Sequence, residues 1–249
     1  MSGFTSEEPV APLTLEYRVF LKNEKGQDVS PLHDTPIYAI YAEKRVFHVV
    51  VEVPRWSHEK MEIATKDPLN PIKQDVKKGY IWNYGAIPQT WEDPGHRDDH
   101  TGCNGDSDPI DVCEIERKVC ARVLGVLARI DEGQTDWKVI VVKATVDWFR
   151  RYKAPDGKPE NEFAFNAEFK DKDIAVDIIK STHDYWKALV SKKMDGKGIS
   201  CMNTTVSERP FKCDPGAAKA IADALSPPRD SGCTVPTDVE KWFHHQKNP

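Results

Sequence analysis

The sequence predicts a mainly β protein with appended α-helices, an α+β fold, and two patterns of its apolar residues indicate this. Through the first two-thirds, apolar residues alternate with polar ones or form short β-branched runs, which is typical of strands. In the last third they recur every three or four positions, as on the buried face of a helix. There is no internal repeat and no convincing linker. We therefore expect one domain over residues 1–249, with irregular tails at about 1–12 and 226–249.

Four segments carry the strand signal. Apolar and polar residues alternate from 13 to 19, and residues 46–53 form a valine-rich run that ends at a proline. Residues 122–130 and 137–142 are also strand-like, and the segment between them is an acidic turn. We therefore expect two strands joined by this turn.

Two segments predict helices in the last third of the chain. Apolar residues have helical spacing over 174–190, and either Asp171 or Asp173 can serve as the N-cap. Two lysines and then Gly196 follow, which is a typical C-terminal signal. Residues 217–225 predict a second, shorter helix.

The composition of the chain indicates which partners and which cellular location to expect. The net charge is −5, so nothing in the composition points to nucleic acid or an anionic membrane as a partner. The N-terminal residues lack the basic and apolar regions of a secretory signal, and no apolar run is long enough to span a bilayer. The six cysteines include no C-x-x-C pair, as expected for reduced thiols. We expect a cytoplasmic protein with no nucleic-acid or membrane partner.

The segment Gly105–Asp111 is the strongest chemical signal in the chain. Asp106, Asp108 and Asp111 place three carboxylates within six residues, and Pro109 fixes the turn between the last two. Close carboxylates repel one another unless cations lie among them, so the cluster favours a hard metal ion. A calcium EF-hand does not fit, because its twelfth position would be Arg117 instead of glutamate. A solvated acidic turn is the alternative.

Further residues of the same chemistry could converge with this cluster. Lys60 and Glu62 are two apart, so in a strand they share a face. Carboxylates can hold Mg²⁺ while lysines and tyrosines bind an anionic, oxygen-rich substrate, and no Ser/His/Asp triad competes. This combination indicates phosphoryl transfer to water. Each residue alone is more often a surface or packing residue, so only the joint pattern is informative. The candidates are Glu52, Lys60, Glu62, Tyr84, Asp131, Asp136, Lys138, Tyr152 and Lys153.

The chain closely resembles a soluble family I inorganic pyrophosphatase of the eukaryotic cytosolic type. The family motif Asp-x-Asp-Pro-x-Asp is matched at residues 106–111. Further matching segments are 51–56, 84–92, 131–133, 148–150 and 155–161, and the similarity covers essentially the whole chain. The resemblance implies a small closed OB-like β-barrel with helices around it and a homodimer. It also implies Mg²⁺-dependent hydrolysis of pyrophosphate to two orthophosphates by metal-activated water.

The resemblance also implies a role for each candidate residue. The tight magnesium ions would be held by Asp106, Asp111 and Asp136, and Asp131 would join them when substrate brings further metal. Asp108 would orient or deprotonate the attacking water, and Glu62 and Glu52 would hold metal-bound waters. The phosphates would be bound by Lys60, Tyr84, Lys138, Tyr152 and Lys153.

Three segments expected from the resemblance are missing, with good matching on both sides of each gap. The first gap follows Gly79 and removes a strand with a phosphate-binding arginine; the others lie near 122–123 and between 142 and 144. Losing a strand opens a barrel or forces new pairing, and losing one preorganised donor slows catalysis by roughly 10²–10³-fold. We therefore weigh two alternatives, an internally shortened but working enzyme and a catalytically weak or silent binding or dimerising protein.

Overall fold

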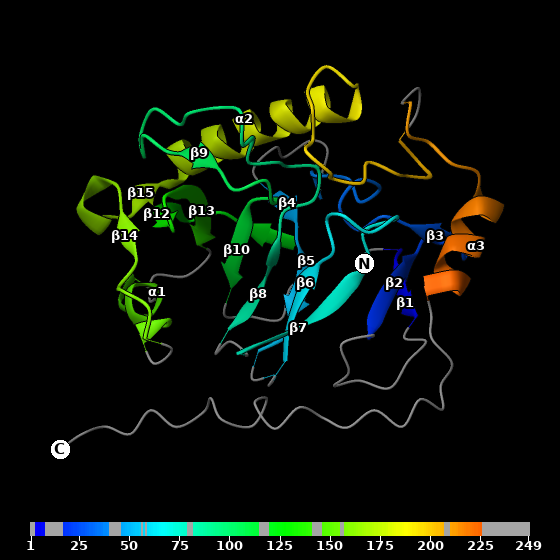
Figure 1. The fold of residues 1–249 in the computed structure, drawn as a ribbon, viewed down its shortest axis with the longest axis horizontal. Helices are drawn as coiled ribbons and strands as arrows, with labels where there is room; N and C mark the ends of the chain where they lie inside the picture. Colours follow the sequence, from blue (N-terminus) through cyan, green and yellow to red (C-terminus); the bar gives the residue numbers. More distant parts are fainter. Residues whose placement is uncertain are drawn as a thin grey trace.

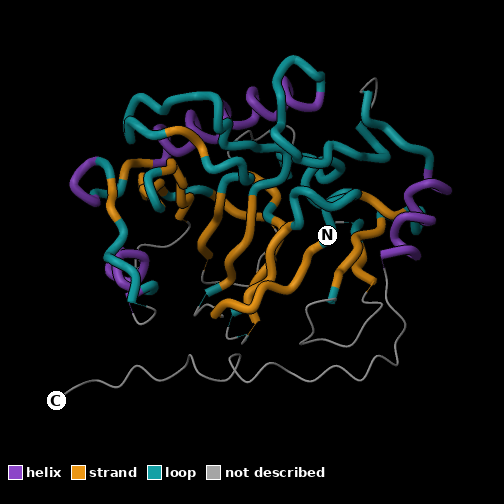
Figure 2. The backbone as a smooth tube through the Cα atoms, in the orientation of Figure 1, coloured by secondary structure: helices purple, strands orange, loops and turns teal. Residues whose placement is uncertain are grey.

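The computed structural model describes residues 3–7, 17–39, 46–55, 57, 59–78, 82–114, 120–140, 146–154, 157–206 and 210–225. Strands make up the centre and helices lie at the periphery, so the predicted mainly β fold with appended helices is confirmed (Figure 2). The gaps expected after Gly79 and between 142 and 144 fall outside the described residues, as do residues 13–16 and 226–249.

The strands and helices have the following bounds. The strands are β1 (Thr5–Glu7), β2 (Arg18–Lys22), β3 (Asp28–Val29), β4 (Val46–His48), β5 (Val50–Val53), β6 (Glu59–Ile63), β7 (Ile72–Lys78), β8 (Asn83–Ala86), β9 (Asn104–Gly105), β10 (Asp111–Glu114), β11 (Cys120–Arg122), β12 (Gly125–Asp131), β13 (Gln134–Ile140), β14 (Glu162–Phe163) and β15 (Lys170–Asp171). The helices are α1 (Val146–Arg151), α2 (Lys172–Val190) and α3 (Pro215–Leu225), with a 3₁₀ turn, η2, at Phe165–Ala167.

The strands pair into two main sheets. The first has the order β1-β2-β7-β6, with β3 on β2, and the second has the order β14-β12-β13-β10-β8-β5, with β9 and β15 added (Figure 1). Where the two sheets meet, β5 lies beside β6, and the Glu52 side chain accepts a 2.7 Å hydrogen bond from the Ile63 backbone N–H. Closure of the whole into a barrel stays a prediction.

Two predictions about strands need correction. The expected irregular N-terminal tail contains β1, which pairs with residues 20–22 of β2 because that edge is available for pairing. The expected continuous strands 46–53 and 122–130 are each broken in two, at Val49 and at 123–124. The reason is a change of partner: β4 and β11 pair with each other, whereas β5 and β12 belong to the second main sheet.

The second sheet packs one of its faces on α2, which starts close to β12 and β13 in Figure 1. Alternate residues of a strand face the same side of a sheet, and here they are apolar. Val126 and Ala128 of β12 and Val139 of β13 pack with Val176 and Ile179 of α2, all buried. The opposite face of the same strands carries Arg129, Asp131, Asp136 and Lys138, together with the buried Leu127.

The predicted helices are confirmed, with small differences at their ends. The Asp171 side chain caps α2 by accepting hydrogen bonds from the backbone N–H groups of Asp173 and Ile174, at 2.9 and 3.0 Å. The helix ends at Val190, with Lys192 in the left-handed conformation at φ 56°, so it stops before Gly196. The short helix α1 was not predicted. None of the helices in the described part of the chain is long and apolar enough to cross a membrane.

A buried histidine links the helix α2 to the loop after β3. His33 is fully buried, accepts a 2.9 Å hydrogen bond from Trp186 Nε1 at its Nδ1, and lies 2.9 Å from the Ser200 carbonyl through its Nε2. The Trp186 donor fixes the neutral tautomer with the proton on Nε2. Burial lowers the pKa of His33 to about 4.

We predict that this histidine makes folding acid-sensitive. A pKa depressed in the folded state means that the unfolded chain takes up the proton first, so stability is lost as the pH falls below about 6.5. Between pH 7 and pH 5 the loss from His33 is about 2 kcal/mol in the free energy of unfolding. Urea titrations at both values should show a smaller decrease for His33→Gln than for the unchanged chain. Equal decreases would contradict the assignment.

Candidate active site

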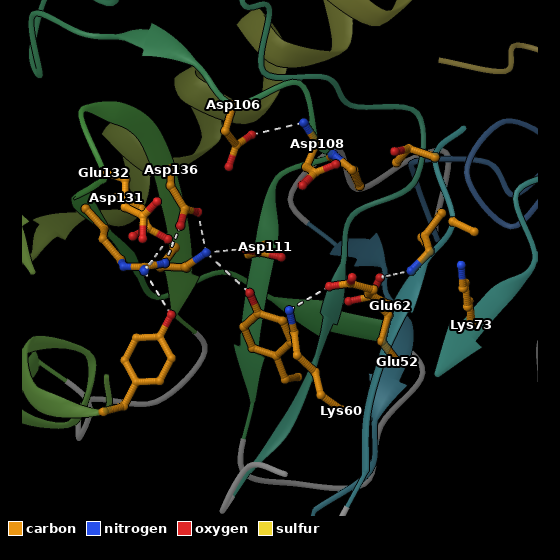
Figure 3. A pocket seen from close by; sticks show the side chains of 18 of the residues that line it. Glu52, Lys60, Glu62, Lys73, Asp106, Asp108, Asp111, Asp131, Glu132 and Asp136 are labelled. Carbon is orange, nitrogen blue, oxygen red and sulfur yellow. Dashed lines mark hydrogen bonds and ion pairs between the residues drawn. The ribbon is translucent and has the colours of Figure 1, made fainter. Parts of the chain in front are cut away.

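The polar face of the second sheet forms one wall of a cleft of about 860 Å³ (Figure 3). All twelve residues predicted as catalytic or metal-binding line this cleft. They come from β5, β6, β8, β10, β12, β13, the turn before β10 and the segment at the end of α1. The structure therefore brings the whole predicted set together; the role of each residue stays a prediction.

The hairpin of β12 and β13 sets the centre of the cleft. Arg129 and Asp131 share one face of β12, and Asp136 and Lys138 share the same face of β13, because each pair is two residues apart. The register places Arg129 opposite Asp136, and both are buried. Two acids and two bases thus meet on one face of a two-stranded ribbon, with apolar residues on the other.

The acidic turn enters this site because of how the chain pairs around it. Both β9 and β10 pair parallel with β13. Residues 106–110 form the loop between these two strands, and this loop lies beside Asp136. The register places Asp111 opposite Lys138. A side chain at Gly105 would not fit, because a Cβ there would lie 2.4 Å from the Glu92 backbone carbonyl.

Lys138 is the buried cation at the floor of the cleft. Its ammonium group forms ion pairs with Asp111 and Asp136 and lies 3.3 Å from the Tyr84 hydroxyl. Burial acts to lower the pKa of Lys138, but the two carboxylates outweigh it and hold the pKa well above its ordinary value. Lys138 is therefore charged at any physiological pH.

The carboxylates have shifted pKa values of both signs. Burial, and then the charges of Asp136 and Asp108, raise the pKa of Asp106. Burial in the recessed cleft, followed by the Asp111 and Glu62 charges, raises the pKa of Asp108 to about 6, although its side chain is accessible from the open side. Burial also acts to raise the pKa of Asp136, but Lys138 and Arg129 hold it below its ordinary value. Such a spread is typical of functional sites.

Two of the predicted phosphate-binding residues, Lys60 and Lys153, lie at the rim of the cleft and pair with carboxylates. Lys60 Nζ is 2.6 Å from the Glu62 carboxylate, so these two share a face as predicted. Lys153 Nζ lies 2.5 and 2.8 Å from the two oxygens of Asp131. Ammonium groups are thus held within reach of the open cleft by the same acids that are predicted to bind metal.

Sequence analysis missed Glu92, which lies behind the acidic turn. Glu92 is buried, and one carboxylate oxygen accepts a 3.0 Å hydrogen bond from the Trp137 backbone N–H. The other oxygen is buried without a hydrogen-bond partner among the described residues, and ligand atoms of Glu92, Asp106 and Asp136 lie within 4.8 Å of one another. Three carboxylates at this spacing fit a hard divalent cation. Nothing in the sequence separates Glu92 from a surface glutamate.

Sequence analysis also missed Arg129, the second buried cation of the cleft. The signal was present, because Arg129 is a charged residue inside an otherwise apolar strand and two residues before Asp131.

The comparisons with known proteins agree with this geometry. The family model of inorganic pyrophosphatase matches residues 49–147. Over 292 aligned positions, which cover all of both chains, the sequence is 69% identical to an inorganic pyrophosphatase of Bos taurus and 70% identical to one of Mus musculus. The chain belongs to the inorganic pyrophosphatase family. Because the alignments have 292 positions and this pyrophosphatase has 249 residues, they contain positions at which it has no residue, which supports the predicted internal shortening.

Solved structures of pyrophosphatases have the same fold. The inorganic pyrophosphatase of Schistosoma japonicum matches with a TM-score of 0.76 and 41% identity, over 82% of this chain and 87% of that one. A truncated vacuolar soluble pyrophosphatase of Trypanosoma cruzi, described in complex with PPi, matches with a TM-score of 0.69 and 35% identity, over 78% of this chain and 93% of that one. The fold of the present pyrophosphatase is thus retained over most of its length.

We predict that Glu92 contributes to metal binding. Burial raises the pKa of Glu92 well above its ordinary value, so Glu92→Gln resembles the protonated side chain and should fold normally. The substitution should weaken Mg²⁺ binding about tenfold or more, as is usual when a partner of a metal site is lost. Calorimetric titration with Mg²⁺ measures this, with the exposed Glu168→Gln as the matched control. An affinity equal to that of the control would show that Glu92 has no such role.

Proposed function

We propose that this chain hydrolyses inorganic pyrophosphate to two orthophosphates with Mg²⁺ as cofactor and water as nucleophile. Family membership supports the reaction, and one observation supports the site. The predicted carboxylates and the predicted phosphate donors line a single cleft, although they come from segments up to about a hundred residues apart.

The carboxylates fit the hard cation that the reaction requires. Asp106, Asp111 and Asp136 would hold the tightly bound Mg²⁺, with Glu92 beside them, and Asp131 would join when substrate brings further metal. When bound, Mg²⁺ neutralises phosphate charge and makes water more acidic. The oxygen-only set of side chains disfavours softer metals.

In this proposal Asp108 would act on the attacking water. It lies in the acidic turn, where its backbone N–H donates a 2.9 Å hydrogen bond to Asp106. With a pKa of about 6, its carboxylate is ionised at neutral pH and close to the value that suits a general base. Glu62 and Glu52 would hold waters of the metal ions on the opposite side of the cleft.

The cationic and phenolic side chains would bind the phosphates. They are Lys60, Tyr84, Lys138, Tyr152 and Lys153, all in the cleft wall. Lys60, Lys138 and Lys153 are ion-paired with carboxylates, and an ammonium group whose carboxylate binds metal can turn to a phosphate oxygen. The same pairing therefore positions the donors before substrate arrives.

Family resemblance supports further proposals about assembly and location. We propose a homodimer, a cytoplasmic location, one domain over residues 1–249, and no nucleic-acid or membrane partner. Light scattering coupled to size-exclusion chromatography measures the mass in solution, and a single species of about twice the 28.2 kDa chain mass is expected.

The proposed reaction predicts magnesium-dependent release of orthophosphate from pyrophosphate by the purified chain. Asp108→Asn should reduce the rate by about 10²-fold or more, the usual contribution of a positioned general base. Asp223→Asn, which changes an exposed carboxylate on α3, is the matched control and should have no effect. If the unchanged chain releases no more phosphate than Asp108→Asn, the silent binding or dimerising protein is the correct alternative.

A further inference from the structure

Arg129 is the one buried cation of the described cleft to which sequence analysis gave no role. Its side chain is 3% exposed and lines the cleft from β12. One terminal nitrogen, Nη1, donates to Oδ2 of Asp136. The other, Nη2, lies 2.6 Å from Oδ2 of Asp131 and 2.9 Å from the Tyr152 hydroxyl. The guanidinium thus bridges two carboxylates that are both predicted to bind magnesium.

The bridge is set by the backbone of the sheet and does not depend on a flexible surface contact. Arg129 is opposite Asp136 in the hairpin register and shares a strand face with Asp131. The ring of Tyr152 covers the guanidinium from one side, with the Cζ atom 5.3 Å from the ring centre. The remaining nitrogen, Nε, is buried and has no hydrogen-bond partner among the described residues.

Both oxygens of Asp136 are engaged by cations in this arrangement. Oδ1 pairs with Lys138 and Oδ2 pairs with Arg129. A lysine can lose its proton, but a guanidinium does not do so in proteins, so the charge at Arg129 is permanent. A divalent ion that binds Asp131 and Asp136 together must therefore displace Arg129 or bind beside it.

We propose that the Arg129 guanidinium occupies the cation position between Asp131 and Asp136, and so lowers the affinity of these carboxylates for divalent ions or the number of ions that they bind. The inference rests on the proposed function, because that function makes Asp131 and Asp136 metal ligands. Arg129 thereby supplies, as part of the chain, positive charge that a further magnesium ion would otherwise bring to this wall of the cleft. It is a determinant of the metal requirement.

Direct metal binding tests this, independently of catalysis. Mn²⁺ is titrated into the metal-stripped chain and followed by the electron paramagnetic resonance of the free ion, and Mg²⁺ binding is measured by calorimetry. Arg129→Met removes the charge at similar length, Arg129→Lys keeps it, and Arg151→Met changes an exposed arginine of α1 as the matched control. Arg129→Gln is a neutral polar second variant in case the methionine variant does not fold.

The proposal predicts that the neutral variants bind Mn²⁺ about tenfold tighter or more, or bind one additional ion per chain, because a full positive charge next to both ligands repels a divalent ion. Arg129→Lys and the control should stay within about threefold of the unchanged chain. Equal or weaker binding by the neutral variants, with the same number of ions, would overturn the proposal.

The same titrations separate this inference from the proposed function. If the unchanged chain binds Mn²⁺ and releases phosphate, but the neutral variants gain nothing, only the inference about Arg129 fails. If the unchanged chain neither binds metal nor releases phosphate, while the neutral variants bind Mn²⁺, the proposed function fails and the inference holds. If no variant binds metal, both fail.

Discussion

Positive and negative side chains balance one another on one face of the second sheet. Carboxylates of Asp111, Asp131 and Asp136 lie close together in a recessed cleft, and their mutual repulsion would oppose folding if it were not compensated. Lys138 and Arg129 provide the compensation from within the same strands. The proposed metal ligands are thus held together by side-chain cations, and under the proposed function metal and protein compete for the same oxygens. On that proposal, the strength of the protein's own ion pairs sets how readily metal enters.

The sheet serves this site by having two chemically different faces. One face packs on α2 through small and branched residues such as Ala128 and Val139, which fixes the strands. Arg129 and Lys138 lie on the other face because side chains alternate between the two faces along a strand. The parallel pairing of β9 and β10 with β13 adds the acidic turn at the point where Asp136 lies. The position of each residue along its strand therefore decides whether its side chain faces α2 or the cleft.

Much of the site could be predicted from sequence because its residues follow short-range rules. The acidic turn, the Lys60–Glu62 pair and the choice of Asp171 or Asp173 as the cap depend on neighbours in the chain, and the family resemblance supplied the roles of the other candidates. Breaks in the strands at Val49 and Leu124 could not be predicted, because they come from pairing between β4 and β11, far apart in sequence. Glu92 was not predicted as a site residue for a similar reason, since only tertiary packing buries it. Arg129 could have been suspected from its apolar strand, but its partners are defined by the hairpin register.

Under the proposed function, these carboxylates bind divalent metal in exchange for their bonds to Lys138 and Arg129. The most direct measurement is anomalous X-ray diffraction from crystals of the chain grown with Mn²⁺. We predict a manganese peak within bonding distance of Asp106, Asp111 and Asp136, with the Lys138 ammonium moved off at least one carboxylate. Crystals that show no such peak at saturating Mn²⁺, with both ion pairs of Lys138 intact, would contradict the claim.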